Sequence, residues 1–434
     1  MKRANAPGKR DPYAALRYPE FRNFTIAAFL FTVALLIQEV VLGYELYTIT
    51  KDPLALGLTG LAEAVPFIGL SLYGGHLADR LSKRKMILWG VAVITAGSVG
   101  LFIVAHGTVR EAIHPSVLVG FIYGSVFLIG LCRAFQSPAA SSLRSFLVPV
   151  HIFENAATWS SSSFQIGAIV GPPIGGFLYA LIGFAPTLLV VVMLLGVAWS
   201  LYARVSEHRT AEVKPAGDLL QSVKEGIGFV WRTKVILYAI SLDLFSVLFG
   251  GVVALLPIYA QDILKVGAEG LGVLRAAGSM GAVITILILQ RISPMGHAWR
   301  NLLIAVTGFG VCIIVFAISP WMTLSVIALA LSGAFDSISV VVRQTLLQLH
   351  TPDEMRGRVM SVNGIFISSS NELGAFESGT AASLLGVIPS AVFGGIMTLL
   401  IVIWVRFRTA SFLHARLDVR APGVGLPQET EVRR

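Results

Sequence analysis

The stretch that decides the fold is GGHLADRLSKRK, residues 74–85, a basic segment between two long apolar runs. The runs on either side, predicted as spans at 56–77 and 85–105, each have about the 20 apolar residues that a helix needs to cross a bilayer. Apolar runs of this length alternate with polar segments along most of the 434 residues. The pattern predicts an all-α polytopic membrane protein.

Composition supports the same class of protein. Hydrophobic residues make up 55% of the chain, charged residues 13%, and the mean hydropathy is +0.77. Soluble domains carry about 25% charged residues, and disordered chains need low hydrophobicity and high charge, so both classes are excluded. The net charge of +9 comes from basic residues in the loops, where they orient the spans, and no nucleic-acid partner is expected.

Twelve apolar runs qualify as spans: 23–48, 56–77, 85–105, 117–141, 157–182, 185–203, 235–259, 268–289, 301–319, 321–343, 360–384 and 388–406. The first run is too long for the core of a signal peptide and has no clear cleavage site, so we expect an uncleaved span. The predicted domains are a cytoplasmic segment 1–22, a six-helix bundle 23–203, a cytoplasmic loop 204–234, a second six-helix bundle 235–406 and a tail 407–434. The second part of the loop has apolar residues near helical spacing and is expected to form an amphipathic helix on the membrane surface.

Lys and Arg residues are distributed unequally between the two sides of such a bundle. With twelve spans, 27 of the 33 lie on the side of both termini, whereas only Lys51, Arg110 and Lys265 lie on the other side. Cytoplasmic loops carry this kind of excess. Both termini are therefore expected in the cytoplasm, with the protein in a bacterial inner membrane.

An internal repeat divides the chain into two similar halves. A shift of 203 residues superposes six Gly or Pro residues within 57 positions, where composition alone predicts roughly one. The pairs are Gly130/Gly333, Pro149/Pro352, Gly171/Gly374, Gly176/Gly379, Gly183/Gly386 and Pro186/Pro389. Two parallel halves with a substrate site between them, near the membrane midplane, form one known transporter plan.

Three segments resemble sequence elements of the major facilitator superfamily. GGHLADRLSKRK is similar to its loop element G-x-L-[GA]-D-R-x-G-R-[RK], with Ser82 in place of the second glycine. RAFQS (133–137) resembles R-x-x-Q-G. GAIVGPPIGG (167–176) resembles G-x-x-x-G-P-x-x-G-G, an element associated with exporters, although Thr158 replaces the upstream glycine of its longer form.

Other stretches narrow the resemblance within that superfamily. DPYAALRYPEFRNF, ITKDPLALGLTGLAEAVP and TPDEMRGRVMSVNG resemble the subfamily of enterobactin exporters, macrolide-efflux proteins and transmembrane secretion effectors. The likeness covers nearly all of 11–406. It implies the twelve-helix major facilitator fold, in two pseudo-symmetric halves, and a monomer.

The loop element contains residues that orientation alone does not require. An acid and a base at the cytoplasmic end of the second span can hold two helix ends together in one state and separate in the other, as alternating access needs. Simple orienting charge is the alternative, but it does not explain the glycine or the aspartate. We interpret the loop as a gate formed by Gly75, Asp79, Arg80, Lys83 and Arg84.

The glycines of the fifth span place small residues on one helical face, so that a neighbouring backbone can approach closely. Two prolines remove N–H donors and are expected to kink this helix. Such a contact can seal the substrate site against proton leak, or it can serve packing alone. The residues concerned are Gly167, Gly171, Pro172, Pro173, Gly175 and Gly176.

Ionisable and amide side chains within spans are costly and indicate function by default. The candidates for the substrate and proton pathway are Gln38, Glu39, Glu63, Arg133, Gln136, Gln165, Asp243, Asp336 and Glu372. Arg133 and Gln136 are three residues apart and are expected to share a helix face. The repeat pairs Arg133 with Asp336, which makes an ion pair between the halves possible.

A proton carrier needs a buried carboxylate that gains and loses a proton near neutral pH. Glu39, Asp243 and Glu372 are the candidates, with substrate binding and a structural ion pair as the alternatives for each. In the superfamily that the chain resembles, the first, fourth, seventh and tenth spans line the cavity. This favours Glu39 and Asp243.

Other functional classes find little support in the sequence. There is no Walker loop for ATP and no catalytic constellation, so neither an enzyme nor a cofactor is expected. None of the eight histidines lies in the middle of a span, which disfavours a metal site. Tyr44 and Tyr47 near Glu45 could form an aromatic wall for an organic cation, or could simply be interface residues.

These patterns predict a secondary active transporter that exports an amphipathic small molecule in exchange for protons. A siderophore or lysolipid exporter with other coupling is one alternative. A transport-inactive membrane sensor or scaffold is the other.

Overall fold

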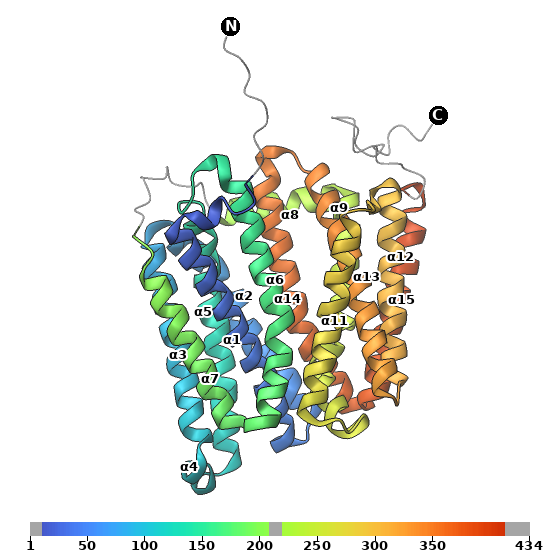
Figure 1. Cartoon of the computed structure of the whole chain (residues 1–434). Helices are drawn as coiled ribbons and strands as arrows, with labels where there is room; N and C mark the ends of the chain where they lie inside the picture. The colour runs from blue at the N-terminus through green and yellow to red at the C-terminus, as the bar shows by residue number, and fades with distance from the viewer. Residues whose placement is uncertain (1–10, 208–218, 413–434) are drawn as a thin grey trace, which may run out of the picture.

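A computed structural model describes residues 11–207 and 219–412. The described chain forms one bundle of long helices (Figure 1). α1 begins and α15 ends at the same end of the bundle, which we call the terminal end. The short helix α4 (Gly107–Ala112) lies at the opposite end, which we call the far end.

The first half contains six long helices: α1 (Pro19–Thr50), α2 (Pro53–Arg80), α3 (Lys83–Ala105), α5 (Pro115–Arg144), α6 (Phe153–Ile182) and α7 (Phe184–Ala203). The second half contains α9 (Lys234–Phe249) with its irregular continuation, α11 (Gly267–Leu289), α12 (Ala298–Ile318), α13 (Met322–Leu349), α14 (Asp353–Leu385) and α15 (Val387–Arg408). Between the halves, α8 (Leu219–Arg232) lies at the terminal end (Figure 1).

The number of membrane-crossing helices follows from length and hydropathy. Within the described residues, eleven helical segments are long and apolar enough to cross a membrane. The twelfth, α14, has 33 residues but carries polar side chains along its length, and it runs from one end of the bundle to the other (Figure 1). The chain is therefore an all-α integral membrane protein, as its hydropathy pattern predicts.

The seventh span, predicted at 235–259, is present, but it is not one continuous α-helix. α9 stops at Phe249, and the chain continues through η3 (Val252–Leu255), α10 (Leu256–Ile258) and the π-helical turn η4 (Tyr259–Ile263). Gly250 and Gly251 occupy the break, and close contacts with the backbones of α9 and α14 leave no room for a side chain at either position. Two consecutive glycines followed by Pro257 weaken a helix at this point.

Both halves pack according to the same scheme. α1 packs on α6 and α7 just as α9 packs on α14 and α15, and the pairs α2–α5 and α11–α13 correspond in the same way. The glycines matched by the repeat also correspond: an added Cβ at Gly130 would collide with the backbone of α2, and one at Gly333 with the backbone of α11. Gly183 and Gly386 both turn the chain at positive φ, 81° and 92°.

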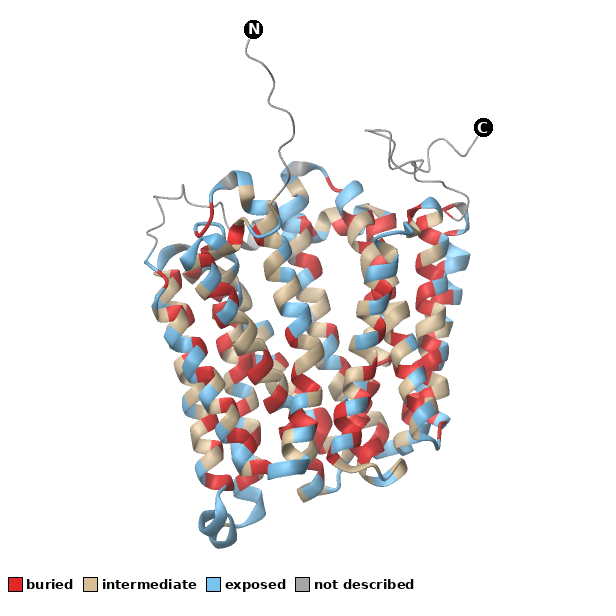
Figure 2. Ribbon diagram, in the orientation of Figure 1, coloured by how far each residue is buried: buried red, intermediate tan, exposed pale blue. Residues whose placement is uncertain are grey.

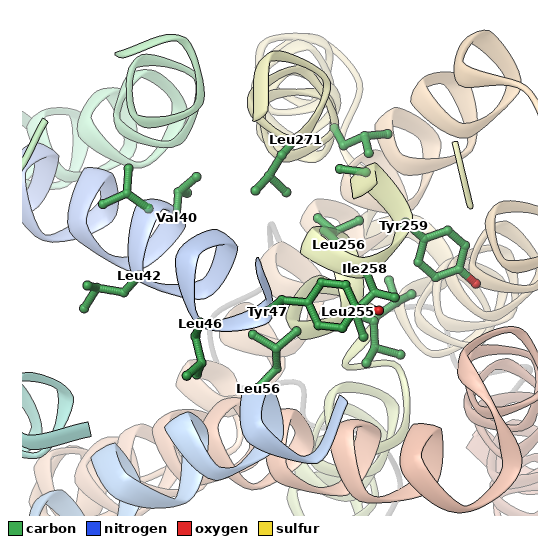
Figure 3. Close-up of a cluster of buried hydrophobic side chains, with 14 of the residues drawn as sticks. Val40, Leu42, Leu46, Tyr47, Leu56, Leu255, Leu256, Ile258, Tyr259 and Leu271 are labelled. Carbon is green, nitrogen blue, oxygen red and sulfur yellow. The ribbon is translucent and has the colours of Figure 1, made fainter. Parts of the chain in front are cut away.

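The two halves meet along two seams, α2 against α14 and α6 against α11. At the far end, one apolar cluster combines side chains of both halves, among them Leu46, Tyr47 and Leu56 of the first with Leu256 and Leu271 of the second (Figure 3). At the terminal end each half has its own apolar cluster instead. Buried positions gather between the halves toward the far end (Figure 2), so the bundle is closed there.

Candidate functional site

A group of charged side chains occupies the α2–α14 seam in the middle of the bundle. Arg133 of α5 forms an ion pair with Glu63 of α2, and its Nη1 lies 3.3 Å from Oε1 of Glu372 on α14. The two carboxylate side chains are 16% and 19% exposed, and the arginine is 35% exposed. Because α14 belongs to the second half, Arg133 joins the two halves by charge.

Small residues let the three helices approach closely enough for these contacts. A Cβ at Gly130, one turn before Arg133, would collide with the backbone carbonyl of Glu63. A Cβ at Gly60 would collide with the backbone carbonyl of Glu372. The Arg133 guanidinium also lies 5.3 Å from the centre of the Phe67 ring, a cation–π distance.

A second ion pair joins the halves near the α6–α11 seam. Nη1 of Arg275 on α11 lies 2.8 Å from Oε1 of Glu39 on α1. Arg275 is 13% exposed and Glu39 is 52% exposed. Glu39, a candidate from the sequence, thus contacts the opposite half through Arg275.

Together these five residues provide three carboxylates and two guanidinium groups. One carboxylate is therefore left without a full counter-charge, because Glu63 and Glu372 share Arg133. Burial makes an uncompensated charge costly. A proton or a cationic group of a substrate is the chemistry that balances such a cluster.

The remaining charged candidates lie within the second half. Asp243 of α9 and Arg343 of α13 form an ion pair, 9% and 2% exposed, so Asp243 does not stand free in a cavity. Asp336 makes no ion pair or hydrogen bond with any residue that the structure describes. The possible pair between Arg133 and Asp336 is thus not formed, because α2 and α14 lie nearer to Arg133 and supply its partners.

Two of the glutamine candidates are buried against α3, and the third is exposed. Gln38 is buried and accepts a hydrogen bond from Ser98 Oγ on α3 at 2.8 Å. Gln136 is buried against α3, where an added Cβ at Gly90 would lie 3.3 Å from its Oε1. Gln165 is exposed. Arg133 and Gln136, three residues apart on α5, contact different helices: Arg133 contacts α2 and α14, and Gln136 contacts α3.

The loop interpreted from the sequence as a gate is only partly described. The Asp79 side chain lies outside the described residues, and Arg80 is exposed. Lys83 is buried, with Nζ 5.6 Å from the centre of the Phe146 ring, and Arg84 Nη2 donates to the Ala203 carbonyl at 2.6 Å. These contacts stay within the first half. They tie the start of α3 to its neighbours.

The loop's two glycines have different surroundings. An added Cβ at Gly75 would meet open space, whereas one at Gly74 would collide with the backbone of Ala134 on α5. The sequence element draws attention to Gly75. The packing shows that Gly74 is the position where a side chain has no room.

The glycines of the fifth span, α6, face two different helices. Cβ atoms added at Gly167, Gly171 and Gly175 would lie 3.1, 2.9 and 3.1 Å from atoms of α1, in the same half. A Cβ at Gly176 would lie 2.6 Å from the Gly272 Cα of α11, in the other half. α6 continues as a helix through Pro172 and Pro173.

A polar contact at the far end went unrecognised in the sequence. Tyr47 donates a hydrogen bond to Asp262, Lys51 Nζ lies 2.9 Å from Gln261 Oε1, and Gln261 Nε2 donates to the Tyr44 carbonyl at 3.1 Å. We call Tyr44, Tyr47, Lys51, Gln261 and Asp262 the far-end clamp, because it joins α1 to the π-helical turn η4. The opposite charges of Lys51 and Asp262, both at span ends, were its only sequence signal.

Glu45 is engaged in the same region. It is 1% exposed, forms an ion pair with Arg110 of α4 and accepts a hydrogen bond from Tyr179 Oη of α6 at 2.5 Å. The interpretation of Tyr44 and Tyr47 around Glu45 as a wall for an organic cation is therefore replaced by a closed network. Among the described residues, no group of His, Cys, Asp and Glu could hold a metal ion.

Comparison with known proteins identifies the family. The family model described as Major Facilitator Superfamily matches residues 24–375. The chain belongs to this superfamily of membrane transporters, as its sequence elements and its two-half bundle indicate.

Two relatives show where the chain is similar within that family. It is 26% identical over 398 residues to the enterobactin exporter EntS of Shigella flexneri, covering 88% of this chain and 90% of that protein. It is also 26% identical over 400 residues, with the same coverage, to the enterobactin exporter EntS of Escherichia coli O81 (strain ED1a). The chain is thus a transporter with similarity to an exporter.

Solved structures confirm the fold. A POT family transporter in complex with 5-aminolevulinic acid superposes with a TM-score of 0.70 at 12% identity, over 90% of this chain and 96% of that one. A D-xylose-proton symporter gives 0.70 at 14% identity, over 89% and 97%. At these identities the likeness concerns the fold alone.

Proposed function

We propose that the protein is a proton-coupled exporter of an amphipathic small molecule, working as a monomer in a bacterial cytoplasmic membrane. The observation that carries the proposal is the charged cluster between the halves. Ionisable groups inside a membrane mark transport pathways, and here they come from α1, α2, α5, α11 and α14.

The conformation supports alternating access. The halves are joined at the far end by an apolar cluster and by the far-end clamp, and each keeps its own core at the terminal end. With both termini in the cytoplasm, as the distribution of Lys and Arg favours, this is the state that receives substrate from the cytoplasm. Rocking of the halves about the two seams would then open the far end and release the substrate outside.

Energy coupling follows from the charge balance of the cluster. A proton that enters from outside neutralises the excess carboxylate, and its release inside restores the charge. A substrate with a cationic or hydrogen-bonding group and an apolar body would occupy the same region in the opposite direction. This is the exchange of one proton for one amphipathic molecule that an antiporter needs.

A second candidate substrate is a siderophore such as enterobactin. The 26% identity with enterobactin exporters over 88% of the chain favours it. Export of a siderophore uses the same fold and the same alternating access, so the two candidates differ in ligand and in coupling.

Reconstituted vesicles test both candidates. Purified protein, inserted in vesicles with an acidic interior, is given ethidium, erythromycin or enterobactin outside. We expect accumulation of at least one compound, its loss on addition of a protonophore, and its loss in Arg133→Gln. Arg291→Gln, in an exposed loop, is the matched control and should behave like the unmodified protein. Absence of transport across the panel by well-folded protein would overturn the proposal.

A further inference from the structure

The geometry points to Glu372 as the residue that binds the coupling proton, and to its ion pair with Arg133 as the bond that keeps the empty carrier closed at the far end. This inference rests on the proposed function and assigns one residue among its three candidates. Its central feature is that Arg133 has two carboxylate partners, one in its own half and one in the other.

The backbone of Glu372 lies in the α2–α14 seam, in close contact with α2. α2 and α14 touch at Gly60, where an added Cβ would collide with the Glu372 carbonyl oxygen. About two turns further along α14, nearer the far end, an added Cβ on Gly379 would lie 2.5 Å from the Gly57 Cα. When the halves separate along this seam, Glu372 must move away from α2 and α5 together with α14.

The two partners of Arg133 respond differently to that movement. Glu63 lies on α2, which packs on α5 in the same half, so its ion pair survives the rearrangement. Glu372 crosses the seam, so its ion pair with Arg133, 3.3 Å long here, must break. Only the second pair can sense the conformation of the transporter.

The charged surroundings of Glu372 are few. Arg133 of α5, Glu63 of α2 and Glu39 of α1 act on it electrostatically. Of the other helices packed on α14, α9 carries Asp243 in its interior, which is paired with Arg343 of α13. Protonation of Glu372 therefore removes its attraction to Arg133 and also its repulsion from Glu63 and Glu39, while Arg133 keeps Glu63 as partner.

This arrangement lets the halves rock when a proton or a substrate is bound and not when both are absent, as an antiporter requires. With a proton on Glu372 the carboxyl is neutral, the bond across the seam is weak, and the halves can rock. With substrate bound, a cationic group that competes for Glu372 has the same effect. With neither, the deprotonated carboxylate binds Arg133 and holds the far end closed, so that the empty carrier does not return and dissipate the gradient.

The two other candidate carboxylates fit this role less well. Glu39 has its own arginine, Arg275, and its side chain is 52% exposed, so its charge is largely compensated. Asp243 pairs with Arg343 inside one half. That pair does not cross a seam, so rocking of the halves does not require it to break.

Spin labels at the far end test the inference without a substrate. Thr108 in the first half and Thr323 in the second are exposed there. Both are changed to cysteine in a chain whose Cys132 and Cys312 are replaced by alanine, and inter-label distances are measured from about pH 5.5 to about pH 8.5. In the unmodified transporter we expect the population with the far end closed to rise roughly fivefold or more with pH, as Glu372 deprotonates.

Glu372→Gln should abolish this pH response and keep the distribution that the unmodified protein has at low pH. Glu63→Gln is the matched control: it removes a carboxylate from the same arginine, but within one half, so the pH response should persist. Glu372→Asp, which still titrates but reaches less far, should show a weaker response. A pH response of unmodified size in Glu372→Gln, its loss in Glu63→Gln alone, or no response in the unmodified protein would each overturn the inference.

Transport measurements separate this inference from the proposed function. If the unmodified protein accumulates ethidium or enterobactin against its gradient, Glu372→Gln should lose accumulation at least about tenfold while still exchanging labelled for unlabelled compound. Retained accumulation in Glu372→Gln would refute the assignment and leave the proposed function standing. If the unmodified protein transports none of the compounds, the proposed function fails, and the pH response of the labels still decides the role of Glu372.

Discussion

Replacing Gly176 by alanine should push the halves apart at the α6–α11 seam. The new Cβ would lie 2.6 Å from the Gly272 Cα and 2.7 Å from the Ala268 carbonyl oxygen. Carbon atoms pack at about 3.5–4.0 Å, so the two backbones must separate by roughly 1 Å. Both obstacles are backbone atoms, so a change of rotamer cannot relieve the contact.

The new contact destabilises one conformation of the transporter, the one closed at the far end. Overpacking of a close contact costs about 1–3 kcal/mol, and the contact exists where the two halves meet, near the closed far end. An energy of this size shifts a two-state equilibrium roughly 5- to 150-fold. We therefore expect Gly176→Ala to populate the state that is open at the far end.

Distances between spin labels at the far end measure this shift directly. Gly379→Ala, the counterpart at the α2–α14 seam, should have the same effect, because its Cβ would lie 2.5 Å from the Gly57 Cα. Gly175→Ala is the matched control, since its Cβ would meet Ile37 of α1 in the same half. Folded Gly176→Ala protein with an unchanged distance distribution would refute the reasoning that this seam holds the far end closed.

Four further substitutions test the contacts around the site. Tyr47→Phe removes a hydrogen bond of the far-end clamp, worth about 1 kcal/mol, and should increase the population open at the far end in the same label experiment. Asp243→Asn leaves Arg343 buried without its counter-charge. We expect the free energy of unfolding to fall by about 3–5 kcal/mol, and the thermal unfolding temperature to fall with it. An unchanged unfolding temperature would show that the pair is not structural. Gly74→Ala should destabilise the protein by about 1–3 kcal/mol, whereas Gly75→Ala, which meets open space, should change stability by less than about 0.5 kcal/mol in the same melting assay.

The fold could be predicted from the sequence because the membrane imposes it. Backbone groups in hydrocarbon must be satisfied within each helix, so apolar runs of sufficient length become spans. The repeat was equally informative, since glycines matched by the shift make equivalent contacts. The break in the helix of the seventh span was the exception. It arises from two glycines in close contact with neighbouring backbones, and such contacts are invisible along the chain.

The candidate site was predicted less completely. An ionisable residue inside an apolar span is energetically costly, so it stands out in the sequence. Glu63, Arg133 and Glu372 were found in this way. Their pairing depends on which helix faces lie opposite each other, and a shift of the sequence cannot show this. It suggested Asp336 as the partner of Arg133, whereas the partners are on α2 and α14. Arg275, which pairs with Glu39, was not among the predicted site residues.

The two halves pack in the same way but carry different charged residues at equivalent positions. Together these two facts explain how a repeated fold can exchange a proton for a substrate. Gly176 and Gly379, equivalent in the repeat, bring the two halves into backbone contact at the two seams, so both seams can rock in the same way. The equivalents Arg133 and Asp336 differ: the first bonds across a seam, and the second makes no ion pair with any part of the chain that the structure describes. Movement along both seams can therefore be permitted or prevented by a charge at one of them. The ion pair that joins the halves near the other seam has one guanidinium, Arg275, for its one carboxylate, Glu39, so it leaves no excess carboxylate to take up the proton.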